Sequence, residues 1–281
     1  MLIASWNVNS IRSRLSQVIN WLEDKKPDVL CLQETKVPDK DFPKEIFKSL
    51  GYNIEIYGQK SYNGVAILSK FDITDVRKGF EGELNETDLK EDLIDQKRII
   101  SAIINGVRII NVYVPNGSSI NSDKFEYKIN WLKKLKEYLT YQEVREESTC
   151  LLGDFNIALN DNDIYSPERY CGSIMASEIE RENLKIILGS RLIDSFRVFE
   201  KFSGHWSWWD YRNNAFELNK GWRIDHIYIS NNLLSNLKSS VIESTQRANI
   251  QPSDHAPVMV DLNLQEDFNE FNDEDDDIFN L

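Results

Sequence analysis

Short apolar runs alternate along the chain with segments in which apolar residues recur every three or four positions. Apolar runs bounded by turn residues predict buried strands, and the wider spacing predicts amphipathic helices. The predicted strands are residues 1–8, 28–34, 52–58, 64–70, 71–80, 98–106, 107–115, 148–157, 191–199, 205–212, 222–230 and 256–264. The predicted helices are about residues 11–26, 122–146 and 175–188. This order predicts an α/β fold in which helices cover a two-sheet core.

Turn residues and charge suggest the limits of the domain. Asn105 and Gly106 separate two apolar runs and predict a tight hairpin. Residues 82–95 are acidic and weakly patterned, which predicts a surface loop. The last 17 residues hold eight acids and no Lys or Arg, so we expect a disordered acidic tail at 265–281 and a single domain at 1–264. Without the tail, 38 acidic residues stand against 33 basic ones, and the net charge changes from −13 to −5.

Composition and the N-terminus bear on location. No apolar run approaches the ~18 residues of a membrane span, and the first residues enter a strand directly instead of forming a signal peptide. Cys31, Cys150 and Cys171 have no metal-like spacing, and two of them lie in apolar runs. These features fit a reducing compartment. We therefore expect a cytoplasmic protein that does not contact membranes and acts as a monomer.

Polar residues fall where predicted strands end or begin. Strand ends on one edge of a sheet lie together, and active sites are commonly built there. Taken singly, each residue has an ordinary interpretation: a turn former, an exposed terminus, a buried histidine or an ion-paired acid. The residues are Asn7, Glu34, Tyr113, Asp154, Asn156, Asp225, Asp254 and His255.

Taken together, these residue types point to one chemistry. Carboxylate and amide oxygens are the ligands preferred by Mg²⁺ or Mn²⁺, and no Cys or His cluster offers a zinc site. Asp and His side chains can transfer protons. The set therefore predicts metal-assisted hydrolysis of a phosphate ester.

Eight segments carry a more specific signal. They are WNVNSIR, PDVLCLQETK, YNGVAILSK, YVPNG, LLGDFNI, WSWWDYR, GWRIDHIYIS and PSDHAPV. In this order they resemble the motifs of the exodeoxyribonuclease III family, the class II apurinic/apyrimidinic (AP) endonucleases of the endonuclease/exonuclease/phosphatase superfamily. The resemblance runs from Met1 to about Leu262 and implies a four-layer α/β sandwich.

The resemblance also implies an activity. Members cleave the DNA backbone on the 5′ side of an abasic site with Mg²⁺, for which Mn²⁺ can substitute, and leave a 3′-hydroxyl. They often add 3′→5′ exonuclease and 3′-phosphatase activity. The expected partner is double-stranded DNA with abasic sites or 3′-blocked ends.

The resemblance assigns site roles motif by motif. Glu34 would be the main metal ligand, with Asn7 and Asp254 nearby. Asp154 would deprotonate the attacking water and Asn156 would hold the water or the phosphate. In a two-ion scheme Asp154 and Asn156 would themselves be ligands.

The remaining assignments concern acid–base chemistry and DNA. His255, oriented by Asp225, would bond to a phosphate oxygen. Tryptophans of the segment 205–222 would line a pocket for an extruded abasic sugar, although an aromatic core cluster is the alternative for some of them. Tyr113 would be a catalytic residue that contacts the phosphate and helps the leaving oxygen. The residues expected to bind DNA or the abasic site are Asn116, Trp208, Trp209, Trp222, Ile224, Arg212, Lys36, Lys124 and Arg223.

Two other functions remain open from the sequence. The same core serves phosphatases and phosphodiesterases that act on small-molecule or lipid phosphates. A DNA-binding relative without catalysis is a third possibility, although every catalytic position is filled.

Overall fold

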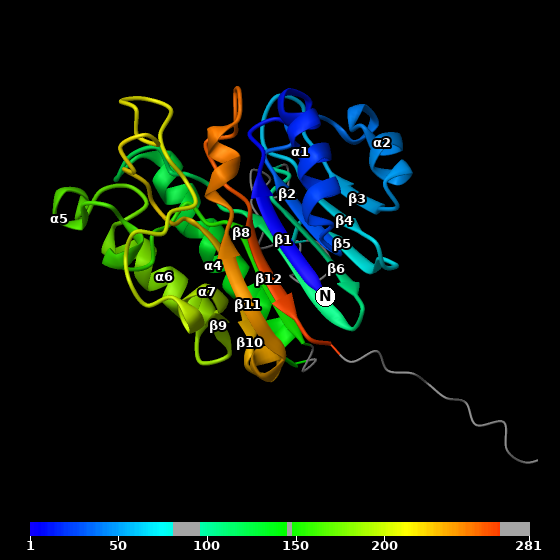
Figure 1. Cartoon of the computed structure of the whole chain (residues 1–281). Coiled ribbons are helices and arrows are strands. Elements are labelled where there is room, and N and C mark those ends of the chain that lie inside the picture. The colour runs from blue at the N-terminus through cyan, green and yellow to red at the C-terminus, as the bar shows by residue number, and fades with distance from the viewer. Residues whose placement is uncertain (81–95, 145–147, 265–281) are drawn as a thin grey trace, which may run out of the picture.

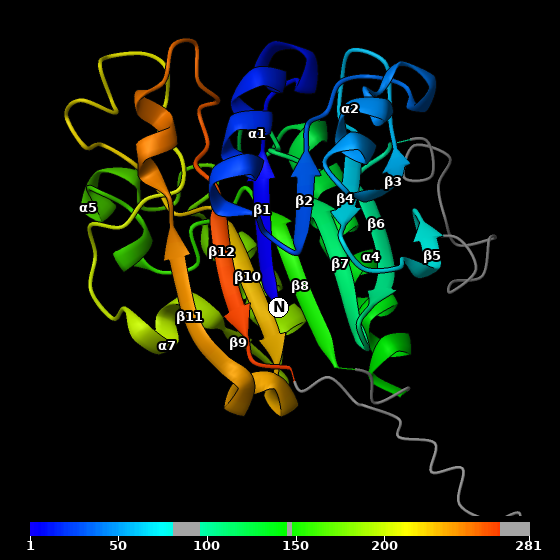
Figure 2. The same ribbon diagram turned by 45° about the vertical axis from the view of Figure 1, so that its right-hand side comes forward.

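Two six-stranded sheets lie face to face in the structure, and helices cover the outer face of each (Figures 1 and 2). The structure is a computed structural model that describes residues 1–80, 96–144 and 148–264. The predicted acidic loop at 82–95 and the predicted tail at 265–281 lie outside the described residues. The predicted α/β class and the four-layer arrangement are confirmed.

The first sheet has the strand order β11-β12-β1-β2-β4-β3. β1 and β2 are parallel, and the other neighbouring pairs are antiparallel. The strands are β1 (Leu2–Asn7), β2 (Val29–Gln33), β3 (Asn53–Tyr57), β4 (Val65–Ser69), β11 (Leu237–Ile242) and β12 (Val258–Leu262).

The second sheet has the order β5-β6-β7-β8-β10-β9 and repeats this plan, with one parallel pair, β7 and β8, among antiparallel neighbours. Its strands are β5 (Thr74–Lys78), β6 (Ile99–Ile104), β7 (Val107–Tyr113), β8 (Thr149–Asp154), β9 (Leu192–Asp194) and β10 (Asp225–Ser230). Asn105 and Gly106 have φ angles of 46° and 73°, so the predicted hairpin turn between β6 and β7 is confirmed.

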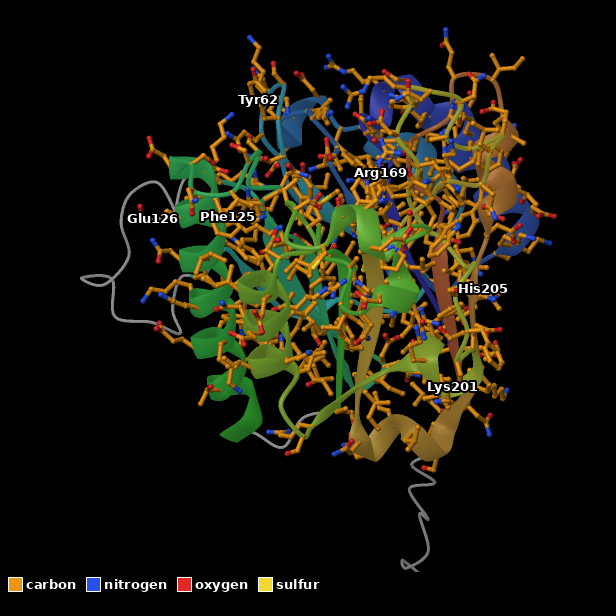
Figure 3. All side chains as sticks on the ribbon, turned by 90° about the vertical axis from the view of Figure 1, so that its left-hand side faces the viewer. Tyr62, Phe125, Glu126, Arg169, Lys201 and His205 are labelled. Carbon is orange, nitrogen blue, oxygen red and sulfur yellow. The ribbon has the colours of Figure 1, made fainter. Side chains whose placement is uncertain are left out.

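Helices form the two outer layers. The α-helices are α1 (Ile11–Lys25), α2 (Lys44–Ser49), α4 (Asp123–Val144), α5 (Pro167–Tyr170), α6 (Glu178–Leu188) and α7 (Ser195–Phe199). Short 3₁₀ helices are η1 (Asp39–Asp41), η3 (Asp161–Asp163), η4 (Asn231–Asn236) and η5 (Ser244–Ala248). Figure 3 views the α4 side, where Phe125 is buried and its neighbour Glu126 is exposed.

Three apolar clusters hold the layers together. The cluster between the sheets includes Ile67 of β4 and Ile109 of β7. A second cluster, with Trp131 of α4, joins the second sheet to α4 and α6. A third, with Trp21 of α1, joins the first sheet to α1 and α2. Each fully buried large apolar side chain contributes roughly 1.5–3 kcal/mol, so these clusters are the main source of stability.

A buried polar bridge crosses between the sheets just below the edge where the parallel strands end. Asn111 of β7 donates from Nδ2 to the carbonyl oxygens of Leu32 (3.0 Å) and Ala66 (2.9 Å) in the first sheet. Its Oδ1 accepts from Gln33 Nε2 (2.7 Å), which also donates to Ser5 Oγ (3.0 Å). The four hydrogen bonds of this network link β7 to the first sheet and favour one alignment of the two sheets.

The sequence predictions differ from the structure in a few elements. Residues 191–199 are not one strand, because the Asp194 side chain accepts from Arg197 N (3.4 Å), which ends β9 and caps α7. Residues 205–212 pair with neighbours only through single bridges at Trp208. The third helix begins at Glu178 instead of 175, since Ser177 and Glu180 form a reciprocal capping box. β11 and α2 were not predicted, because one is polar and the other very short.

Candidate active site

Side chains from three neighbouring strands of the second sheet meet at one edge. The strand register places Tyr113 beside Asp154 and Asp154 beside Asp225. β7 and β8 are parallel and end there, whereas β10 is antiparallel to β8 and begins there. The predicted convergence of these strand ends is therefore present in the structure.

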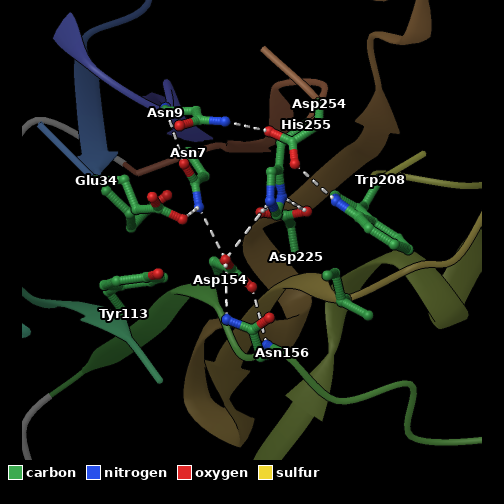
Figure 4. Close-up of polar contacts among 12 residues, drawn as sticks. Asn7, Asn9, Glu34, Tyr113, Asp154, Asn156, Trp208, Asp225, Asp254 and His255 are labelled. Atoms are coloured by element: carbon green, nitrogen blue, oxygen red, sulfur yellow. Dashed lines mark hydrogen bonds and ion pairs between the residues drawn. The ribbon is translucent and has the colours of Figure 1, made fainter. Parts of the chain in front are cut away.

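The first sheet supplies Asn7, at the end of β1, and Glu34, directly after β2. Asn7 Nδ2 donates to Glu34 Oε1 (3.0 Å) and to Asp154 Oδ2 (2.9 Å), so one amide links carboxylates from the two sheets (Figure 4). Burial tends to raise the pKa of Glu34, but the charge of Lys36 and the Asn7 hydrogen bond outweigh it and lower that pKa. Glu34 is therefore ionised at neutral pH.

His255 and Asp225 form a buried pair beside this link. His255 Nδ1 donates to Asp225 Oδ2 (2.8 Å), which also accepts from Ser207 Oγ (2.7 Å). His255 Nε2 lies 3.7 Å from Asp154 Oδ2. Burial opposes the imidazolium, but the charges of Asp225 and Asp154 prevail and raise the pKa of His255 to about 10. A protonated His255 thus faces the centre of the site.

Asp154 is 1% exposed, and burial is the main reason that its pKa is raised to about 7. Its Oδ1 accepts from the backbone N of Asn156 (2.9 Å). Asn156 has a φ of 49°, and its Oδ1 accepts from Asn116 Nδ2 (3.0 Å). Asparagine adopts this left-handed conformation more readily than most other non-glycine residues. A carboxylate with a pKa near neutrality is suited to take a proton.

A chain of polar contacts leads from Glu34 to the adjoining aromatic residues. Lys36 Nζ contacts Glu34 Oε2 (2.8 Å) and donates to Asn9 Oδ1. Asn9 Nδ2 donates to Asp254 Oδ1 (2.9 Å), and Trp208 Nε1 donates to Asp254 Oδ2 (3.0 Å). These hydrogen bonds and the charge of His255 overcome burial and lower the pKa of Asp254.

A pocket of about 300 Å³ lies beside this series of polar contacts, next to Trp208. Three of the expected DNA-binding residues, Trp208, Trp222 and Arg212, line it. Ile224 is 1% exposed and packs in one apolar cluster with Trp222, so it does not line the pocket as expected. Residues that the sequence did not indicate also line the pocket, namely Tyr165, Tyr170, Ser173, Ile174, Met175 and Lys220. All of them except Lys220 lie at residues 165–175, after the predicted strand at 148–157 and up to the start of the predicted helix at 175, where only the aromatic residues near α5 offered a signal.

Two expected DNA contacts lie elsewhere. The Arg223 side chain is 1% exposed and pairs with Asp163 (2.7 Å) and Asp194 (2.6 Å), which corrects the expectation that it contacts phosphate. Trp209 is 2% exposed and packs in a separate cluster, so it is no part of the pocket wall. Lys36 is half-buried at the site, and Lys124 is exposed in the first turn of α4.

The donor set fits a hard divalent cation. Glu34, Asp154 and Asp225 bring three carboxylates to one buried edge, and oxygen donors of this kind suit Mg²⁺ or Mn²⁺. Asn7 directs its amide nitrogen to the carboxylates, because its Oδ1 accepts from Asn9 N (3.0 Å). Both oxygens of Asp254 are already hydrogen-bonded. The carboxylates of Asp154 and Asp225 and the ring of His255 each offer a ligand atom within 4.8 Å of the other two, and Asn7 links Asp154 to Glu34.

The arrangement of the chain matches known proteins. The sequence profile of the endonuclease/exonuclease/phosphatase family matches residues 4–255. The chain belongs to this family. Among relatives within it, exodeoxyribonuclease III of Haemophilus influenzae is 36% identical over 274 residues, which cover 93% of this chain and 100% of that protein.

Solved structures of family members have the same fold. The 3′ phosphatase NExo from Neisseria, bound to a product DNA hairpin, is 40% identical with a TM-score of 0.87, and the match covers 93% of this chain and 99% of that one. An AP endonuclease from Archaeoglobus fulgidus is 36% identical with a TM-score of 0.87, covering 94% and 100%. The chain is thus an enzyme of the exodeoxyribonuclease III and AP endonuclease group, within a metal-dependent hydrolase family.

Proposed function

We propose that this enzyme is a Mg²⁺-dependent DNA repair nuclease that cleaves the backbone on the 5′ side of abasic sites and leaves a 3′-hydroxyl. It would also remove 3′-phosphates and act as a 3′→5′ exonuclease on duplex DNA. The observation that carries the proposal is the aromatic pocket joined to the carboxylate and imidazole cluster through the Trp208–Asp254 hydrogen bond. The names of the Neisseria and Archaeoglobus relatives support it.

The described residues suit this hydrolysis. Asp154, with its raised pKa, would take the proton of the attacking water, and Asn156 would hold the water or the phosphate. Protonated His255 would donate from Nε2 to a phosphate oxygen, with Asp225 fixing the ring through Nδ1. When bound at Glu34, Mg²⁺ or Mn²⁺ would neutralise the phosphate, and in a two-ion scheme Asp154 and Asn156 would also be ligands.

Two neighbouring side chains would complete the phosphate site. Tyr113 follows the same edge, where burial and the charge of Glu34 raise the pKa of its hydroxyl well above the ordinary value. It therefore stays protonated and able to donate a hydrogen bond to the phosphate or the leaving oxygen. Asn116 is exposed, and its amide nitrogen is already directed toward Asn156. Both would contact the phosphate.

Substrate selection would come from the pocket. Trp208 and Trp222 form walls that suit a sugar without a base, because extruded nucleotides are selected by the shape of the receiving pocket. Arg212, whose side chain is 82% exposed at the pocket, would enter the duplex as a wedge. Lys36 and Lys124 would bind backbone phosphates.

A labelled duplex with one abasic analogue tests the proposal. Incubation with Mg²⁺ should yield one incised strand with a 3′-hydroxyl, and excess chelator should stop the reaction. An otherwise identical duplex without the lesion serves as the control. An intact strand together with turnover of small phosphate esters would instead favour the small-molecule phosphatase function.

Three further expectations stay predictions. They are the monomeric state, the cytoplasmic location, with association to the nucleoid when DNA is bound, and the single domain at 1–264. Among the described helices, none is both long and apolar enough to cross a membrane.

A further inference from the structure

A buried lysine lies directly beneath the candidate phosphate-binding loops. The Lys128 side chain, on α4, is fully buried, and its ammonium donates to three oxygens. They are Glu180 Oε1 (2.5 Å), the carbonyl of Asn156 (2.7 Å) and the carbonyl of Asn116 (3.2 Å). Its stem passes under Gly117, where an added Cβ would lie 3.1 Å from Lys128 Cδ. All three N–H groups of the ammonium are therefore used, and none remains for substrate.

Glu180, in the first turn of α6, completes the arrangement from the other side. Its Oε1 also accepts from Met175 N (3.1 Å), and its Oε2 accepts from Ser177 N (3.1 Å) and Ser177 Oγ (2.6 Å). Met175 lines the aromatic pocket, and its Sδ lies 3.5 Å from Asn116 Nδ2. We call Lys128 and Glu180 the clamp. The clamp joins α4 and α6 to the loop after β7 at Asn116, to the loop after β8 at Asn156, and to the pocket wall at Met175.

The energetics of a buried ion pair point to a use beyond stability. Removing two charges from water is expensive, and well-packed apolar residues often stabilise a core as well or better. The carbonyl oxygens held by the clamp belong to Asn116 and Asn156, whose side chains also contact each other. Asn156 has a left-handed φ of 49°, and its carbonyl oxygen in this conformation accepts from Lys128 Nζ.

We propose that the clamp is a positioning device that fixes Asn116 and Asn156 for the reaction and ties the pocket wall at Met175 to the same frame. The inference rests on the proposed function, because it assumes that both asparagines face the scissile phosphate. Lys128 and Glu180 do not touch substrate and act only through the residues that they hold. Small displacements of positioned groups have large effects on rate, so loss of the clamp lowers kcat more than it raises KM.

The test is the neutral double variant Lys128→Met/Glu180→Gln. The glutamine introduced on α6 can keep the capping box of that helix, and no unpaired charge is buried, so the variant should fold with a circular dichroism spectrum like that of the parent. We expect kcat for abasic-site incision to fall about 10- to 100-fold, with KM within about threefold of the parent. The matched control is Lys134→Met/Glu137→Gln, an ion pair on the same helix as Lys128 in which Lys134 is partly buried and Glu137 is exposed, and it should leave kcat unchanged.

A double-mutant cycle separates positioning from a general structural effect. On an Asn116→Ala/Asn156→Ala background the clamp substitutions should cause little further loss of kcat, because both side chains through which they act are gone. A full additional loss on that background would overturn the proposal, as would a clamp variant with parental kcat.

Hydrogen exchange, which needs no abasic DNA, tests the clamp separately from the proposed function. Hydrogen exchange should increase at residues 114–118 and 154–158 in the clamp variant and stay unchanged in α1. Unchanged exchange in both loops would overturn the clamp. If the parent leaves abasic duplex intact but removes a 3′-phosphate, the proposed incision fails, and the same kcat comparison is made on the 3′-phosphate.

Discussion

The indole nitrogen of Trp208 donates a hydrogen bond to Oδ2 of Asp254 over 3.0 Å, and Asp254 directly precedes His255 in the chain. The wall of the pocket and the acid–base cluster therefore share a hydrogen-bonded frame. Asn9 holds the other oxygen of Asp254, so the carboxylate cannot turn away without losing a second partner. In the proposed reaction, recognition of the sugar and chemistry at the phosphate would therefore be physically connected.

Removing this hydrogen bond while keeping the aromatic ring should weaken catalysis. Hydrogen bonds to charged groups contribute about 1.5–3 kcal/mol, so Trp208→Phe should lower kcat/KM for abasic incision at least about tenfold. Trp209→Phe is the matched control, since Trp209 lies outside the pocket and its Nε1 has no hydrogen-bond partner among the described residues. Steady-state incision assays compare the two variants, and equal losses would contradict the role assigned to Trp208.

Asp154→Asn should separate binding from cleavage. The amide keeps the size of the side chain but cannot take the proton of water, so we expect cleavage to fall roughly 10²- to 10⁴-fold. Affinity for the abasic duplex, measured by fluorescence anisotropy with chelator present, should stay within about threefold, because the other phosphate contacts remain. Asp161→Asn, at an exposed carboxylate paired with Arg181, serves as the control and should retain full activity. Equal activity in Asp154→Asn and the parent would remove Asp154 from the mechanism.

His226 should make stability sensitive to acid. Burial, followed by the charge of Arg223, lowers the pKa of His226 from 6.5 to about 4. Below about pH 6.5 the unfolded chain binds a proton that the folded protein does not accept until about pH 4. The contribution of His226 to the free energy of unfolding is therefore complete above about pH 6.5. It falls by on the order of 3 kcal/mol as the pH decreases from about 6.5 to about 4.

His226→Phe checks this prediction. Phenylalanine retains a ring that can pack against Tyr228 and Phe155 but cannot titrate. Urea unfolding at pH 7 and pH 4.5 should show a smaller loss of unfolding free energy in the variant, by about 2–3 kcal/mol. His205→Phe, at a surface histidine, should follow the parent. Parallel curves for parent and His226→Phe would contradict the prediction.

Arg223 should matter for folding, and Arg212 for DNA. Arg223→Met leaves Asp163 and Asp194 without their buried partner, which typically destabilises a protein by about 3–5 kcal/mol. Arg212→Met removes only an exposed pair with Asp210 and should leave the urea midpoint unchanged. Under conditions in which both variants are folded, Arg212→Met should bind the abasic duplex more weakly than Arg223→Met does. A stable Arg223→Met protein would refute the structural role.

The strand-end residues could be predicted because their signal is local. An apolar run that ends at Asn7, Tyr113 or Asp154 indicates both a buried strand and a polar group at its edge, without knowledge of neighbours. The resemblance to a known family then supplied the roles, and the structure adds the contacts among them. The Asp225 and His255 pairing joins positions 30 residues apart and was accessible only through that resemblance.

Other parts of the site depend on partners that are distant in sequence. Arg223, between the apolar Trp222 and Ile224, has the pattern of a groove cation, and only the fold reveals the acids that surround it. Lys128 has the pattern of a surface lysine on a helix, because Glu180 lies 52 residues away. Burial of a charge cannot be predicted when the compensating charge comes from another element.

Asn111, in the protein interior, helps to set the distance between the Glu34 and Asp154 carboxylates at the site. Glu34 follows one strand that this residue anchors and Asp154 ends a strand adjacent to its own, so the spacing of the two carboxylates depends on how the sheets are seated. A purely apolar interface would let the two sheets shift relative to each other, whereas the directional hydrogen bonds of Asn111 favour one relative position. Substitutions in the buried bridge, at Asn111 or Gln33, should therefore change the turnover rate although these residues do not contact the substrate.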